Sequence, residues 1–160
     1  MNMNSFQLEG SFNEIMKTVP SKYDIFAIAA IADNPNSSSE LLNKISQINH
    51  PRMGDKLFNL IDLNGYNRKG LSVTRLLLYN HNVSSETLMR LFDYDNEYLP
   101  YDIAAIQEKL TSDLIRKLYI KYKNKKGEDY VYQRMKIKEI IKANPKTPED
   151  IKKELDQINN

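Results

Sequence analysis

The sequence predicts an all-α fold, and three observations support this prediction. Apolar residues recur at intervals of three and four along most of the 160 residues, and no segment alternates apolar and polar side chains as a strand does. Only five glycines and six prolines interrupt the chain. A polar turn followed by a helix start recurs along it. Residues 1–160 are therefore expected to form one helical domain.

Helix breakers and capping residues set the boundaries of the predicted helices. A first helix covers about 6–19 and stops before Pro20. The next helix, apolar nearly all round, runs from Ser21 to Asn34-Pro35, because a residue before proline is pushed out of the α region. The later helices cover about 38–49, 53–63, 71–80, 84–94, 100–109, 111–124, 129–143 and 147–158, with a loop at 65–70. Predicted buried faces carry Met53, Leu57, Leu60 and Ile61; Leu88, Leu91 and Phe92; and Leu114, Ile115, Leu118 and Tyr122.

One turn motif recurs. The segments Asn34-x-Asn36-x-Ser38-Ser39-Glu40-x-Leu42 and Asn80-x-Asn82-x-Ser84-Ser85-Glu86-x-Leu88 lie 46 residues apart and share six of nine residues. Weaker copies are Thr111-Ser112-Asp113-Leu114 and Asn144-Pro145-Lys146-Thr147-Pro148-Glu149-Asp150. In each copy a Ser or Thr hydroxyl is expected to cap a helix, and acidic residues complement the helix dipole. In the first copy, Ser37 and Glu40 are expected to form a capping box.

The motif predicts an αα-hairpin that is repeated about four times. The expected repeat units cover about 21–49, 70–95, 100–124 and 129–158, and residues 1–19 form an N-terminal capping helix. The motif spacings of 46, 27 and 36 residues are irregular.

Asn34-Pro35-Asn36-Ser37-Ser38-Ser39-Glu40-Leu41-Leu42 and Asn144-Pro145-Lys146-Thr147-Pro148-Glu149-Asp150-Ile151 resemble the Asn-Pro-x-Thr/Ser-Pro-Glu-x-Leu hallmark of variant leucine-rich repeats. The resemblance implies a short right-handed α-solenoid of four to five antiparallel hairpins, close to HEAT-like repeats. It also implies a scaffold with a binding surface and no catalytic residues. The irregular spacing departs from the short constant period of that family. The iron–sulfur cluster of some members does not transfer, because the chain has no cysteine.

Little in the sequence points to catalysis, so we expect no enzyme, no cofactor and no metal site. Without cysteine there is no thiolate nucleophile, disulfide or cysteine-based metal centre. His50 and His81 lie beside turn residues, and a turn role explains both. Asp93-x-Asp95-x-Glu97 is similar to the start of a calcium loop, but Tyr98 and Ala104 stand where that loop needs Gly and Glu.

The compartment is expected to be the reducing cytoplasm. The longest apolar run, Ile25 to Ala32, is too short to span a membrane, and no signal peptide precedes it. The net charge is only +2, so no strongly basic or acidic surface covers the whole protein.

Charge is unevenly distributed in the C-terminal half. Residues 86–108 hold six acids and one base, a net charge of −5, whereas 109–146 hold twelve bases and four acids, a net charge of +8. Seven of the ten tyrosines lie between 94 and 132. The predicted protein-binding residues are Asp93, Tyr94, Asp95, Glu97, Tyr98 and Tyr101. The predicted nucleic-acid-binding residues, in the alternative interpretation, are Lys121, Lys123, Lys125, Lys126, Arg134 and Lys136.

The leading functional hypothesis is a non-catalytic protein-binding module, an adaptor or inhibitor. The 17 Asn, 17 Lys and 16 Ile indicate an AT-rich genome, and a short chain of this kind suits a phage or mobile-element protein that acts on a host enzyme. The alternative is a nucleic-acid-binding helical-repeat protein that uses residues 109–146. A third hypothesis is an enzyme similar to HEAT-like base-excision enzymes. These enzymes generally depend on aromatic and acidic groups in a cleft, and the chain contains no tryptophan. A solvated basic face and half-buried core tyrosines would explain the same residues without any binding role.

Overall fold

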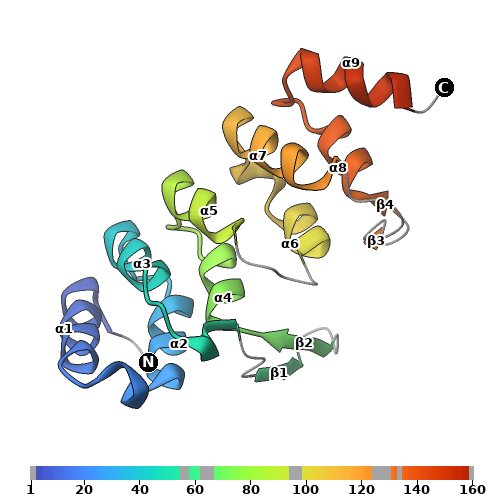
Figure 1. The fold of residues 1–160 in the computed structure, drawn as a ribbon. Helices are drawn as coiled ribbons and strands as arrows, with labels where there is room; N and C mark the ends of the chain where they lie inside the picture. Colours follow the sequence, from blue (N-terminus) through green and yellow to red (C-terminus); the bar gives the residue numbers. More distant parts are fainter. Residues whose placement is uncertain are drawn as a thin grey trace. The chain divides into compact units, whose positions relative to one another are not determined.

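The computed structural model describes residues 3–54, 58–61, 67–93, 99–123, 131–132 and 135–158 (Figure 1). This part of the chain is predominantly helical, which confirms the predicted all-α class for its packed layers. The α-helices are α1 (Ser5–Met16), α2 (Ile25–Asp33), α3 (Ser39–Ser46), α4 (Val73–Tyr79), α5 (Ser85–Leu91), α6 (Leu99–Ala105), α7 (Ser112–Tyr122), α8 (Ile137–Ala143) and α9 (Glu149–Ile158). Short 3-10 helices are η1 (Pro20–Lys22), η2 (Pro51–Gly54) and η3 (Gln107–Lys109). No helix of the described residues is long and apolar enough to cross a membrane.

Two short antiparallel hairpins correct the prediction that no strand is present. β1 (Phe58–Ile61) pairs with β2 (Asn67–Leu71), with Leu60 opposite Arg68, so the helix predicted over 53–63 is wrong. The sequence between these strands contains Asn64-Gly65, a pair that favours a hairpin turn.

The second hairpin pairs β3 (Val131–Tyr132) with β4 (Met135–Lys136). The helix predicted over 129–143 therefore begins only at Ile137. The β-branched and aromatic residues of β3 favour an extended backbone.

Helix boundaries near the N-terminus also differ from the prediction. α1 ends at Met16, and α2 begins at Ile25 instead of Ser21. The reason is that Pro20 starts the 3-10 helix η1, after which the Asp24 side chain caps α2 by accepting the backbone N–H of Ala27 at 3.0 Å.

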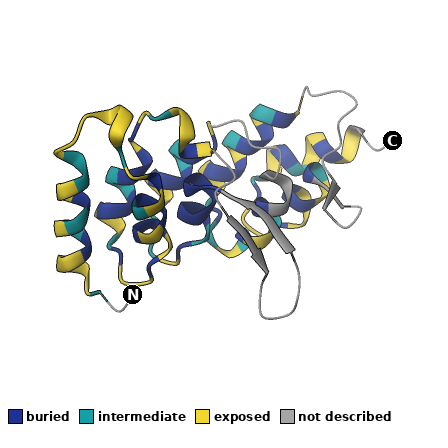
Figure 2. Ribbon diagram, turned by 90° about the horizontal axis from the view of Figure 1, so that it is seen from below, coloured by how far each residue is buried: buried dark blue, intermediate teal, exposed yellow. Residues whose placement is uncertain are grey.

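The chain divides into two compact units, residues 1–87 and 88–160. In unit 1, α1 packs on α2, and both α2 and α3 pack on α4. In unit 2, α8 packs on α6, α7 and α9. Buried residues face inward within each unit (Figure 2). Every residue of α4 from Val73 to Leu78 is buried.

Two of the three predicted buried faces are confirmed. Leu88, Leu91, Phe92, Leu114, Ile115, Leu118 and Tyr122 are all buried. Of the third face, Met53 is buried, but it lies in η2 and not in a helix with the residues that follow it.

The predicted helix starts are confirmed at three of the motif copies. The hydroxyls of Ser38, Ser84 and Thr111 accept backbone N–H groups from the third residue after each, at 3.1, 3.1 and 3.3 Å. At the fourth copy, α9 begins directly after Pro148. The polar turn has the same length in three copies, since residues 34–38, 80–84 and 144–148 each join two α-helices, whereas the turn before α7 spans 106–111 and contains η3. The spacing varies because the connections between hairpins, residues 47–72, 92–98 and 123–136, differ in length.

The capping box predicted for Ser37 is wrong. Its hydroxyl donates to the carbonyl oxygen of Ile31, six residues back, at 2.5 Å. The hydroxyl of Thr147 donates in the same way to Ile141. Both side chains are buried, so these bonds close the turn onto the end of the preceding helix.

Position 83 lacks this hydroxyl, which gives a first prediction. Val83 occupies the place of Ser37 and Thr147, and its backbone N–H likewise bonds the oxygen of Asn80 at 3.1 Å. Val83→Thr should add a bond to the Leu77 carbonyl and stabilise the protein by about 0.5–1 kcal/mol in urea unfolding. Val19→Thr, at a position that is 56% exposed, is the matched control and should change stability little. An equal effect of both substitutions would contradict the equivalence of the three turns.

Candidate binding surfaces

The asparagines of the motif join one turn to the next in unit 1. The Nδ2 of Asn80 donates to the carbonyl oxygens of Ala32 and Asn34, at 2.8 and 3.0 Å. The Nδ2 of Asn82 donates to the oxygens of Pro35 and Ser37, both at 2.9 Å. Because these bonds satisfy the backbone of the preceding turn, the asparagines hold one hairpin on another.

Unit 2 repeats the arrangement with different side chains. The Nδ2 of Asn144 donates to the oxygen of Gln107 at 3.3 Å, and the Nζ of Lys146 donates to the oxygen of Glu108 at 3.0 Å. Gln107 and Glu108 occupy the places of Asn34 and Pro35 in the turn. Within each unit, the side chains of one turn therefore bond the equivalent carbonyl oxygens of the preceding turn.

Charged residues link the second helices of neighbouring hairpins. Arg116 on α7 makes a bidentate pair with Asp150 on α9, at 2.7 and 3.0 Å. This pair raises the pKa of Arg116 and lowers that of Asp150. On α3, hydrogen bonds with Glu9 and then Glu40 raise the pKa of Lys44. All of these groups are exposed enough for solvent to weaken the attraction.

The predicted protein-binding residues begin at the C-terminal end of α5. The Nζ of Lys117 on α7 lies 2.7 Å from the Asp93 carboxylate and also donates to the carbonyl oxygen of Met89. The Nζ of Lys121 donates to the oxygen of Phe92 at 2.8 Å. Two lysines thus satisfy the last carbonyls of α5 and fix the residue that opens the acidic segment. Tyr94, Asp95, Glu97 and Tyr98 lie outside the described residues. Tyr101 belongs to α6, and only its backbone is described.

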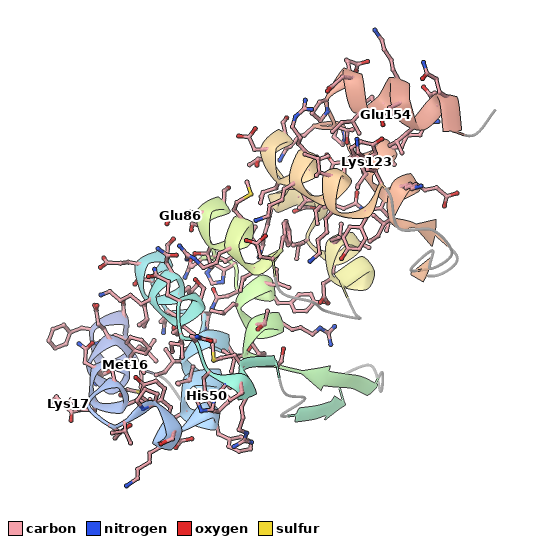
Figure 3. The ribbon with its side chains drawn as sticks, viewed as in Figure 1. Met16, Lys17, His50, Glu86, Lys123 and Glu154 are labelled. Atoms are coloured by element: carbon pink, nitrogen blue, oxygen red, sulfur yellow. The ribbon has the colours of Figure 1, made fainter. Side chains whose placement is uncertain are left out.

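The predicted nucleic-acid-binding residues are described in part. Lys121 bonds Phe92, as above. The Nζ of Lys123 lies 3.8 Å from the carboxylate of Glu154, its neighbour in Figure 3, and 5.8 Å from the centre of the Tyr119 ring. Both described lysines therefore have partners within the protein. Lys125, Lys126 and Arg134 lie outside the described residues, and Lys136 is described only as backbone in β4.

One residue of each predicted site lies near the contact between α6 and β3 in unit 2 (Figure 1). Tyr101 of the acidic set lies in α6, and Lys136 of the basic set lies in β4, which pairs with β3. The side chains of both residues, and residues 94–98, lie outside the described part of the chain, so the observed contact joins the backbones of α6 and β3.

The described histidines fit turn roles. The Nδ1 of His50 accepts the backbone N–H of Arg52 at 3.1 Å, and its ring lies 6.3 Å from that of Tyr23. His81 is exposed in the turn between α4 and α5. In the part of the chain that the structure describes, no three His, Asp or Glu side chains are grouped to hold a metal ion.

Tyr119 gives a prediction about alkaline pH. Burial, together with the Glu154 carboxylate, raises the pKa of Tyr119 to about 12. A tyrosine in the unfolded chain ionises near pH 10, so ionisation favours the unfolded state between these values. Stability should be unaffected below pH 10 and fall by about 2 kcal/mol as the pH rises to 12. In Tyr119→Phe, urea unfolding at each pH should show a smaller fall, and an identical fall would contradict the burial of this hydroxyl.

No protein-family model, no curated protein and no solved structure matches this chain.

Proposed function

We propose that the chain is a non-catalytic protein-binding module whose hairpins stack as an α-solenoid. It binds its partner through α6 and the hairpin β3–β4 of unit 2, together with the acidic residues of 93–98. The solenoid is supported by the same turn-to-turn register in both units, carried by Asn80 in one and Asn144 in the other.

The contact between α6, which follows the acidic residues in sequence, and β3, which lies among the basic ones, supports the choice of a protein partner. A phosphate backbone is repelled by a carboxylate cluster, whereas a protein surface can match both signs. Tyrosine between such charges is common in protein interfaces. The partners of Lys121 and Lys123 within the protein further reduce the positive charge that a nucleic acid could use.

Affinity capture tests for a protein partner, and a gel shift, described below, tests for a nucleic acid. Capture from the native host should return one stoichiometric protein, and a variant with Asp95→Asn, Glu97→Gln and Tyr101→Ala should lose it. Glu14→Gln with Asp33→Asn, exposed acids of unit 1, is the matched control and should retain it. If the triple variant still captures the partner protein, the proposed binding site in unit 2 is wrong.

The second candidate function, nucleic-acid binding, is favoured only by the +8 net charge of residues 109–146. It requires a gel shift of duplex DNA or RNA that weakens steeply with salt. It also requires that Lys121→Ala, Lys123→Ala, Lys125→Ala and Lys126→Ala together abolish the shift. We expect the protein to give no such shift at physiological salt.

A further inference from the structure

Hydrogen bonds identify α1 as a second helix of the repeat. The Nδ2 of Asn36 donates to the oxygen of Met3 at 2.9 Å, as that of Asn82 does to Ser37. Met3 directly precedes the capping residue Asn4, just as Ser37 precedes the cap of α3. α1 therefore lies beside α3 in the same way that α3 lies beside α5.

In α5 and α9, one position faces the second helix of the preceding hairpin. It is the second residue after the cap, and it reaches the fifth residue after the cap of the earlier helix. Glu86 lies 3.5 Å from Asn43 in this way, and Asp150 pairs with Arg116. The remaining second helices of the motif, α3 and α7, carry Glu40 and Asp113 at this position.

In α1 this position is Phe6, and its side chain is 86% exposed, the most exposed large apolar residue of the described part. Gly10 lies one turn further along the same face, and no atom lies within 4 Å of the place where a Cβ would stand. Asn13 continues the face and is exposed.

Charges beside this face are already neutralised. Glu14 pairs with Lys17 at 2.5 Å, and Glu9 pairs with Lys44 at 2.7 Å. The three residues of the face, Phe6, Gly10 and Asn13, are themselves uncharged. A helix placed on it would meet no unpaired charge.

We infer that this face binds the same face of a second copy of the chain, with the two α1 helices antiparallel. A large side chain and an open glycine one turn apart are self-complementary under a two-fold axis, because each Phe6 ring then lies over Gly10 of the other copy. The contact is independent of the function proposed above, which uses unit 2. A single helix pair buries less than the roughly 1,200 Å² of a stable complex, so the dimer is weak.

Sedimentation of the full chain at increasing concentration tests the inference. The protein should shift from monomer to dimer at high concentration, and Phe6→Glu should raise the dissociation constant by about tenfold or more. Gly10→Gln should weaken the dimer equally, although it keeps or raises the melting temperature because glutamine favours helix over glycine. This second variant separates docking from folding.

Ile120→Glu is the matched control, since Ile120 is a 61% exposed apolar residue on α7. It should leave the dimer unchanged. A protein that stays monomeric up to about 1 mM would overturn the inference. A dimer that neither α1 variant weakens would also overturn it, because that dimer would use another surface. A dimer that Ile120→Glu weakens equally would likewise overturn it, because the association would then be non-specific and apolar.

Discussion

Replacing Asn80 with aspartate is expected to destabilise the protein by about 3 kcal/mol or more. Asn80 is only 7% exposed, and its Nδ2 bonds two carbonyl oxygens of the preceding turn. A carboxylate keeps the shape of the side chain but cannot donate, so both bonds from Nδ2 are lost and the negative charge is repelled by the oxygens of Ala32 and Asn34. Urea unfolding, together with hydrogen exchange of the α2 and α4 amides, measures the loss.

The control for this substitution is Asn49→Asp, which makes the same change at an exposed position and should cost less than about 0.5 kcal/mol. Acidic pH provides a second check. A protonated carboxyl can donate one of the two bonds, so the cost of Asn80→Asp should be smallest below the pKa of unfolded aspartate, about 3.9, and grow as the pH rises. Equal stability of the two variants at pH 7 would show that the turns are not held together by this amide.

Much of the fold could be predicted because its signals are local. Ser38, Ser84 and Thr111 cap the helices that the motif predicts, since a hydroxyl at such a place satisfies backbone N–H groups only a turn away. The periodicity of Leu114 to Tyr122 likewise gave the buried face of α7. These features depend on neighbouring residues alone.

What could not be predicted depends on residues far apart in sequence. Asn80 and Asn82 looked like helix-ending residues, and their role in stacking appears only when the turn 46 residues earlier lies beside them. The spacing of Leu57, Leu60 and Ile61 fits a helix face, but the pairing of Phe58–Ile61 with β2 decided the conformation of this segment. A signal for the stacking role was present, because an asparagine pair at the same spacing in two copies exceeds what a single turn needs.

The candidate site was predictable as two segments and not as one surface. Charge counting separated the acidic residues around Asp93 from the basic ones around Lys123. Whether the two segments meet depends on how α6 packs, and the contact between α6 and β3 is not encoded in either segment alone. The partners of Lys121 and Lys123 are also distant in sequence. Because both lysines bond groups within the protein, less of their positive charge is accessible to a ligand.

Truncating Phe92 is expected to have the largest effect of any single apolar substitution in unit 2. Phe92 follows the last residue of α5 and is fully buried. Phe92→Ala should cost about 3–5 kcal/mol, because it removes apolar burial and leaves a cavity that the surrounding helices fill only partly. Phe92→Leu, which refills most of that space, should recover the larger part.

Phe6→Ala is the matched control, since it removes the same side chain from a site that is 86% exposed. Its effect on unfolding should stay within about 0.5 kcal/mol, although it should weaken the α1 dimer. Hydrogen exchange should localise the Phe92→Ala effect to α7, because Lys121 on that helix bonds the Phe92 carbonyl and Lys117 holds Asp93 next to it. Loosening these residues also frees the start of the acidic segment, so Phe92→Ala should lower partner capture even where the protein remains folded. A variant that loses stability and keeps full capture would show that the acidic segment binds without being held in place at Asp93.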